Sequence, residues 1–135
     1  MKMDNKNIRL VGDLQDYGVP YSSLYIDIES RKLYIFVRVS PPDCSPIECA
    51  ATEVSPQDIN EYIDGNIGIS TFFERQDYGF VKLENGQIKH SSLLEDLPDE
   101  RMKKMNYVDP DFYYDEVWLE VFLKRLVERK PLEIV

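Results

Sequence analysis

Apolar and polar side chains alternate through two neighbouring segments of this chain, and that pattern restricts the possible fold more than any other feature. Leu24, Ile26 and Ile28 recur with a period of two, and residues 33–39 continue the alternation after a short polar segment. A period of two is typical of a β-strand that buries one face, because successive side chains point to opposite sides. The polar segment has the length of a hairpin loop. We therefore predict a β-hairpin over about residues 21–39.

The same pattern predicts which residues of that hairpin face each other. With a four-residue loop over residues 29–32, the predicted pairs are Ile28 with Leu33, Ile26 with Ile35, and Leu24 with Val37. All of these side chains then share one face, as the pleat requires. The opposite face carries Tyr25, Asp27, Tyr34 and Phe36. These aromatic residues are expected either to be covered by a helix or to form an exposed contact surface.

Asn85 and Gly86 form the strongest turn signal, because this dipeptide adopts the positive φ angles of a two-residue hairpin turn. The turn predicts a second hairpin over about residues 79–92. The predicted pairs are Leu83 with Ile88, Lys82 with Lys89, and Val81 with His90. The lysine pair is mildly unfavourable, because like charges directly opposite each other destabilise a sheet.

Helices are predicted from their start signals and from helical spacing. Ser55 and Pro56 are typical of the N-cap and the first position of a helix. Thr71 and Glu74 have the spacing of a capping box, which predicts a second, short helix. A long C-terminal helix is predicted over about residues 111–129, with an apolar stripe formed by Trp118, Leu119, Phe122, Leu123 and Leu126.

These elements predict a single α+β domain that spans residues 1–135. Its centre is expected to be an antiparallel sheet of about four to six strands built from the two hairpins. Helices should pack on one face of the sheet, with the C-terminal amphipathic helix as the main cover. A chain of 135 residues buries on the order of two thirds of its unfolded surface, so it needs no metal or disulfide to fold.

The formal net charge of -9 excludes several classes of function. Non-specific binding of nucleic acid depends on Lys and Arg neutralising phosphates, and docking on anionic lipid also needs basic residues. We therefore expect no nucleic-acid partner and no membrane partner. The polar first residues and the lack of a long apolar run predict a cytoplasmic protein without a signal peptide or a transmembrane helix.

The acidic residues gather before the predicted C-terminal helix, where nine of them fall between Glu95 and Glu120. Tyrosines lie among them, and aromatic side chains are enriched at protein–protein contacts. The candidate binding residues are Tyr107, Asp109, Asp111, Tyr113, Tyr114, Asp115 and Glu116. A simpler role stays open for each kind of side chain. The carboxylates can complement a helix N-terminus, and the rings can close the base of the helix against the sheet.

The sequence contains no coherent catalytic arrangement. His90 is the only histidine and the one candidate for a general base, although a strand residue at the edge of the core is the simpler interpretation. Cys44 and Cys49 lack the spacing of redox or zinc motifs, and they are expected to be inert thiols. The carboxylates of residues 109–116 could hold Ca²⁺ or Mg²⁺, but their spacing departs from that of an EF-hand loop. No cofactor is predicted.

The predicted function is therefore a non-catalytic, acidic module that binds another protein. Immunity proteins and inhibitors fit this description, because acidic surfaces steer association with basic partners. One alternative is an enzyme of unfamiliar type with a divalent-metal carboxylate site near residues 109–116. Another is a structural homo-oligomer joined through an open sheet edge or through the face that carries Tyr25 and Phe36.

Two segments of the sequence, PYSSLYIDIESRKLYIFVRVS and VSPQDINEYIDGNIGISTFFER, together form a pattern. It resembles a group of small uncharacterised bacterial proteins that share a domain of unknown function. In that group a β-hairpin precedes a helix, a glycine and a second short helix. The likeness covers roughly residues 8–80, and Phe72 and Phe73 stand where the group tends to be polar. The resemblance implies a fold and carries no catalytic residues.

Overall fold

The computed structural model describes residues 7–16, 20–39, 47–75, 78–84, 87–93 and 117–128. Within these ranges the chain forms six strands and three helices. The strands are β1 (Ile8–Asp16), β2 (Pro20–Asp27), β3 (Leu33–Arg38), β4 (Ile47–Val54), β5 (Tyr78–Glu84) and β6 (Gln87–Leu93). The helices are α1 (Pro56–Ile63), α2 (Ile69–Arg75) and α4 (Val117–Val127).

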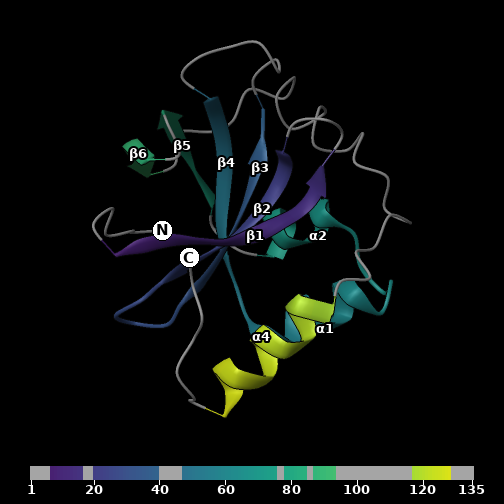
Figure 1. Ribbon diagram of the computed structural model, residues 1–135. Helices are drawn as coiled ribbons and strands as arrows, with labels where there is room; N and C mark the ends of the chain where they lie inside the picture. Colours follow the sequence, from purple (N-terminus) through teal and green to yellow (C-terminus); the bar gives the residue numbers. More distant parts are fainter. Residues whose placement is uncertain are drawn as a thin grey trace.

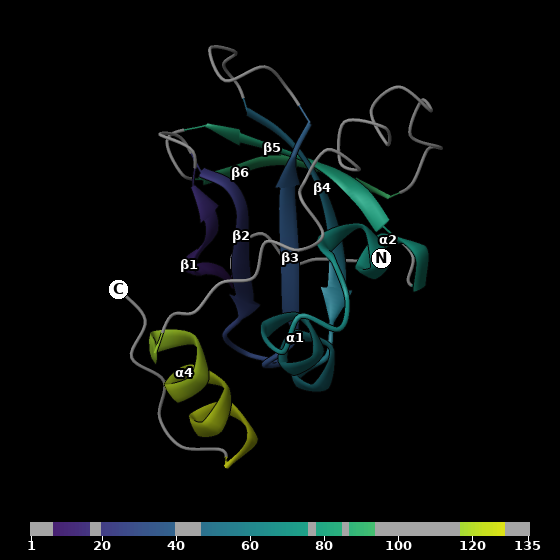
Figure 2. The same ribbon diagram turned by 90° about the vertical axis from the view of Figure 1, so that its right-hand side faces the viewer.

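The strands form one antiparallel sheet, in which each strand pairs with the next one along the chain in the order β1 to β6 (Figure 1). The sheet twists strongly, so that β5 and β6 run across the direction of β2 and β3 (Figure 2). Such a twist follows from the right-handed preference of each strand. An antiparallel sheet accompanied by helices is an α+β architecture, as the alternating segments predict.

All three helices contribute to a core on one face of this sheet. Ile59 of α1, Phe72 of α2 and Leu119 of α4 are buried together with strand residues such as Leu24 and Ile35. We call this core the helix-covered cluster. Its buried members are Leu14, Leu24, Ile26, Leu33, Ile35, Val37, Val39, Ala50, Val54, Ile59, Tyr62, Phe72, Phe73, Leu119, Phe122, Leu123 and Leu126.

A second core lies on the opposite face, and we call it the strand-only cluster. Its buried members are Ile8, Tyr25, Tyr34, Phe36, Cys49, Ala51, Val81 and Leu83. The rings of Tyr25 and Phe36 are stacked with their centroids 4.1 Å apart, and both are at most 7% exposed. The alternative that these rings form an exposed contact surface is therefore wrong. Among the described residues, no helix contributes to this cluster.

The pairing of β2 with β3 differs from the predicted register by two residues. Leu33 faces Ile26 instead of Ile28, and Ile35 faces Leu24 instead of Ile26. A shift of two residues keeps each side chain on its own face, because the side-chain period is also two. The predicted face is thus right, whereas the predicted partners are wrong.

Asp27 explains this shift, because its carboxylate organises a longer loop. Asp27 Oδ1 accepts hydrogen bonds from the backbone N–H groups of Glu29 at 2.9 Å and Ser30 at 3.0 Å. The Arg31 N–H donates to the Asp27 carbonyl at 2.7 Å, and Arg31 adopts a positive φ of 64°. The loop therefore includes Ile28, whose side chain is 47% exposed.

The pairing of β5 with β6 also departs from the predicted register. Leu83 keeps its predicted partner, but a bulge follows, so that His90 faces Lys82 instead of Val81. Lys89 is the extra residue of this bulge. The two lysines consequently do not stand directly opposite each other, which removes an unfavourable pair of like charges.

The helix α1 begins with the predicted cap. Ser55 Oγ accepts a hydrogen bond from the Asp58 N–H at 3.1 Å, and Asp58 Oδ2 accepts one from the Ser55 N–H at 3.3 Å. This reciprocal arrangement satisfies backbone donors that have no partner inside the helix. The helix α2 begins at Ile69, so Thr71 lies inside it and is not its cap.

The helix α4 is shorter, in the described part of the chain, than the predicted helix over residues 111–129. It runs for 11 residues, Val117–Val127. The remaining positions of the predicted helix lie outside the described residues, so its full length stays a prediction. None of the helices that the structure describes is long and apolar enough to cross a membrane.

Candidate functional site

All candidate binding residues between Tyr107 and Glu116 lie outside the described residues, as do the carboxylates considered for a divalent ion. In the described ranges, no three or more His, Cys, Asp or Glu side chains form a group that could hold a metal ion. The backbone of His90 pairs with Lys82, and the His90 side chain lies outside the described part. The structure instead brings a different set of residues together, between α4 and β1.

The helix α4 carries two neighbouring stripes of side chains. One stripe is buried in the helix-covered cluster, where Leu119 is 0%, Leu123 3% and Leu126 7% exposed. The other consists of Trp118, Val121, Phe122 and Arg125. Spacings of three and four residues place these four side chains along one side of a helix. The second stripe therefore faces a neighbouring surface of the molecule, where Phe122 is buried at 7% exposure, Trp118 and Arg125 are partly buried, and Val121 is exposed.

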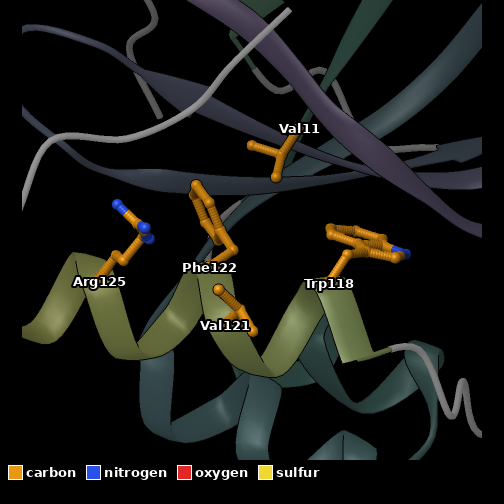
Figure 3. A pocket seen from close by; sticks show the side chains of 5 residues that line it. All are labelled: Val11, Trp118, Val121, Phe122 and Arg125. Carbon is orange, nitrogen blue, oxygen red and sulfur yellow. The ribbon is translucent and has the colours of Figure 1, made fainter.

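That neighbouring surface is the edge strand β1, and a groove lies between the two elements (Figure 3). The groove has a volume of about 300 Å³. Figure 3 shows Trp118 and Arg125 at its two ends, with Phe122 and Val121 of α4 and Val11 of β1 between them. Its volume lies at the lower end of the range found for ligand pockets. Val121 is 49% exposed, so the groove opens to solvent.

A bulge in β1 builds one wall of this groove. The pairing with β2 is shifted between Leu10 and Gly12, which leaves Val11 as the extra residue. In such a bulge two successive residues oppose a single residue of the partner strand. Val11 lines the groove, and Gly12 also faces the helix, because a Cβ atom built on Gly12 would meet Trp118. The bulge thus directs two consecutive positions towards α4.

Gly12 allows the indole ring of Trp118 to approach the backbone of β1. A Cβ atom at this position would lie 2.6 Å from Cη2 and 2.8 Å from Cζ2 of Trp118. Such distances are far below van der Waals contact, so only glycine accommodates the ring where it lies. The position of Trp118, and with it the shape of one end of the groove, depends on this glycine.

The lining side chains determine what the groove can do chemically. Among the described lining residues, four present aromatic or aliphatic surface, and Arg125 provides the only charge. A guanidinium group keeps its proton in proteins, so it cannot act as a general base. These described residues can bind an apolar group and an anion, but they offer no nucleophile and no group that transfers protons near neutral pH.

Sequence reasoning found only part of this site. Trp118 and Phe122 were expected to lie together in the apolar stripe of the last helix, but Trp118 is only partly buried and lines the groove. Val11, Val121 and Arg125 carry no motif that singles them out. The one available signal was Gly12, because a glycine inside a strand marks a bulge or a close backbone approach.

Cys49 is a free thiol buried in the strand-only cluster. Burial is the main reason why the pKa of Cys49 is raised to about 12, with a smaller contribution from Glu48 in the same direction and an opposing one from Arg38. A thiol with this pKa is protonated at neutral pH and is a poor nucleophile. Cys49 is therefore the inert thiol that its sequence context predicts, whereas Cys44 lies outside the described residues.

Comparison with known proteins adds no assigned residue to the groove. The likeness of residues 8–80 to an uncharacterised bacterial group consequently remains a resemblance of sequence pattern. No family model, no curated protein and no solved structure matches the chain.

Proposed function

We propose that this protein is a non-catalytic module that binds another protein, and that the groove between α4 and β1 receives a side chain of that partner. The observation that carries the proposal is the composition of the groove. Trp118, Phe122 and Arg125 line it together. Tryptophan and arginine are strongly enriched among the residues that dominate binding energy at interfaces, and phenylalanine is enriched in interface cores.

The exposure of the groove supports this role. Val121 is 49% exposed beside the partly buried ring of Trp118, so apolar surface is open to water in the isolated chain. A partner side chain that enters the groove would remove this surface from water and gain roughly 25 cal/mol for each Å² buried. The groove is large enough for one such anchor, which is the usual form of an interface hot spot.

The acidic and aromatic residues 107–116 extend the proposed interface along the chain. The last of them, Glu116, directly precedes Val117, the first residue of α4. This adjacency in the sequence is the reason to include the segment in the proposed interface. The net charge of -9 favours a partner with basic patches, which suits an immunity or inhibitor role.

A matched pair of substitutions on α4 tests the proposal. Val121 and Val127 are both exposed, at 49% and 66%, but only Val121 lines the groove. We expect Val121→Glu to abolish capture of the partner from a native lysate at low salt, because it places a carboxylate among apolar groups. Val127→Glu should leave capture unchanged.

Circular dichroism and thermal unfolding of both variants should match the original chain, since both positions are exposed. Equal capture by the original protein and by both variants would remove the groove from the interface. A lysate from which the original protein captures nothing would contradict the binding role itself.

A further inference from the structure

The groove is not uniform along its length, and this asymmetry specifies the chemistry of its occupant. Trp118 lies at one end and Arg125 at the other (Figure 3). Arg125 follows Trp118 by seven positions on the same helix, which corresponds to about 10 Å along the helix axis. An occupant that fills the groove therefore places an apolar group against Trp118, Phe122 and Val11, and another group within reach of a guanidinium.

Arg125 favours an anion at its end of the groove. A guanidinium has five N–H donors in a planar fork that matches the two oxygens of a carboxylate. Apolar neighbours reduce the screening by water, so an ion pair formed beside Val11 and Phe122 is stronger than the same pair on an open surface. With five donors, Arg125 can accept a ligand carboxylate in addition to other interactions within the chain.

The charges around Arg125 shape this preference. Lys124 is exposed beside it, and Arg31 donates from Nη2 to the Leu126 carbonyl at 3.3 Å, which adds positive charge near the end of α4. Glu128 is an exposed acid one turn further along the helix, and it competes with an incoming carboxylate. Among the described residues near Arg125, two basic side chains stand against one acid, so this end of the groove is locally cationic in the described part of the chain.

This local charge is opposite in sign to the charge of the whole protein. The net charge of -9 repels an anion at long range, but charges further away than about 10 Å are largely screened at an ionic strength of 0.1 M. An ion pair in direct contact with Arg125 is much shorter than this screening length, so dissolved salt weakens it far less. The local guanidinium therefore decides what enters the groove, even though the overall charge favours a basic partner.

We propose that the groove selects a segment of the partner protein in which an aromatic or aliphatic side chain is followed closely by a carboxylate. The apolar side chain lies against Trp118 and Phe122, and the carboxylate pairs with Arg125. This inference rests on the proposed function and narrows it, because it assigns an acidic, apolar segment to the groove within a partner whose remaining surface can be basic.

Two dyes that differ in one charge test the preference directly. Anilinonaphthalene sulfonate is an anion, and phenylnaphthylamine has the same ring system without the sulfonate. Trp118 is the only tryptophan of the chain, so energy transfer from Trp118 to either dye reports binding to the protein, and the substitutions described next test whether the dye lies in the groove. We expect the anionic dye to bind the folded protein at least about tenfold more tightly than the neutral dye.

Substitution of the guanidinium provides the second arm of this experiment. Arg125→Gln should weaken binding of the anionic dye by about tenfold and leave the neutral dye unaffected. Lys124→Gln is the matched control, because it removes a neighbouring positive charge that does not line the groove. Because the Lys124 charge is exposed and screened by salt, its loss should weaken binding of the anionic dye by less than about twofold and leave the neutral dye unaffected. Thermal unfolding verifies that both variants are folded.

The outcomes separate this inference from the proposed function. Equal binding of the two dyes, or equal loss with Arg125→Gln and Lys124→Gln, would overturn the preference for an anion while the test with Val121→Glu still stands. If neither dye binds, the groove is not an apolar receptor and both proposals fail. If a captured partner leaves the anionic dye in place, the groove binds small anions, and its assignment to a partner segment is wrong.

Discussion

The two cores of this protein lie on opposite faces of the same sheet, and they are closed in different ways. Three helices close the helix-covered cluster, and a groove of about 300 Å³ remains where α4 meets β1. Among the described residues, only strands form the strand-only cluster, and its aromatic rings are at most 7% exposed.

The geometry of the covering elements explains this difference. A helix is a straight cylinder, whereas a sheet is twisted, so the two surfaces diverge towards the edge of the sheet. Side chains of neighbouring strands instead follow the same twist and remain in contact. An open groove therefore remains on an apolar face where a helix diverges from the sheet, and not simply where apolar residues are most numerous.

The largest expected change in the free energy of unfolding comes from removing a buried aromatic ring, and the loss of a ring that lines the groove serves as its comparison. Phe36→Ala should lower the free energy of unfolding by about 3–5 kcal/mol, because Phe36 is 2% exposed and stacked on Tyr25. Trp118→Ala should cost roughly half as much, since Trp118 is only partly buried. Urea denaturation followed by circular dichroism measures both. Equal losses would mean that Trp118 is a core residue like Phe36.

The next effect concerns the contact that shapes the groove. Gly12→Ala should destabilise the protein by about 1–3 kcal/mol, because the new Cβ atom would displace the indole ring of Trp118. The fluorescence of Trp118 should shift to longer wavelength as the ring moves towards water. An alanine substitution at Leu10, which is 44% exposed on the same strand, is the control and should leave the spectrum unchanged.

A smaller effect is expected when the pH is raised by a single unit above pH 9, and it belongs to the strand-only cluster. The pKa of Cys49 is raised by burial from 9.0 to about 12, so both states keep the proton below pH 9. Above pH 9 the unfolded chain loses this proton while the folded chain retains it. Stability should therefore fall by about 1 kcal/mol for each pH unit between pH 9 and pH 12. Burial also raises the pKa of Tyr25 and of Tyr34, which act in the same direction at higher pH.

Denaturation at several pH values, with Cys49→Ala beside the original chain, isolates the contribution of the thiol. The variant should show a smaller loss of stability between pH 9 and pH 10, and Cys44→Ala serves as the comparison. A loss of stability that is identical with and without Cys49 would place its pKa in the ordinary range.

The smallest change in the free energy of unfolding is expected at the edge of the strand-only cluster. Lys32 Nζ lies 3.5 Å from Glu53 Oε1, and the two side chains are 59% and 40% exposed. Exposed ion pairs contribute little, because water and salt screen them and both side chains lose freedom. Lys32→Gln should therefore change the free energy of unfolding by less than about 1 kcal/mol. A larger loss of stability would indicate that the ion pair is less accessible to water than the exposure of its two side chains implies.

Local sequence patterns predicted the face on which most side chains of the first hairpin lie, but not their partners. Alternation assigns Leu24, Ile26 and Ile35 to one face, and all three are buried in the helix-covered cluster. The register depended on the loop, where the Asp27 carboxylate binds two backbone N–H groups and draws Ile28 out of the strand. The sequence around Asp27 does not by itself indicate that the carboxylate will bind the backbone of the loop and shift the register.

The groove could not be predicted from sequence patterns, and the reason is a different one. Trp118 and Phe122 were expected to act together with the leucines of α4, because their spacing fits a single broad stripe. Periodicity shows that these residues share a side of the helix, but it does not show which part of that side meets the sheet. Val11 and Gly12 are distant in the sequence, so no local pattern connects them to α4.

The sequence by itself determined the strands of the two predicted hairpins, the cap of α1 at Ser55, the α+β class and the acidic character of the chain. Each of these depends on residues close together in the chain or on simple composition. The tertiary structure alone decided that β1 and α4 meet, that Gly12 admits the ring of Trp118, and that Arg125 provides the only charge among the described residues that line the groove. Those features arise where a helix and a twisted sheet diverge, and such divergence depends on the packing of the whole molecule.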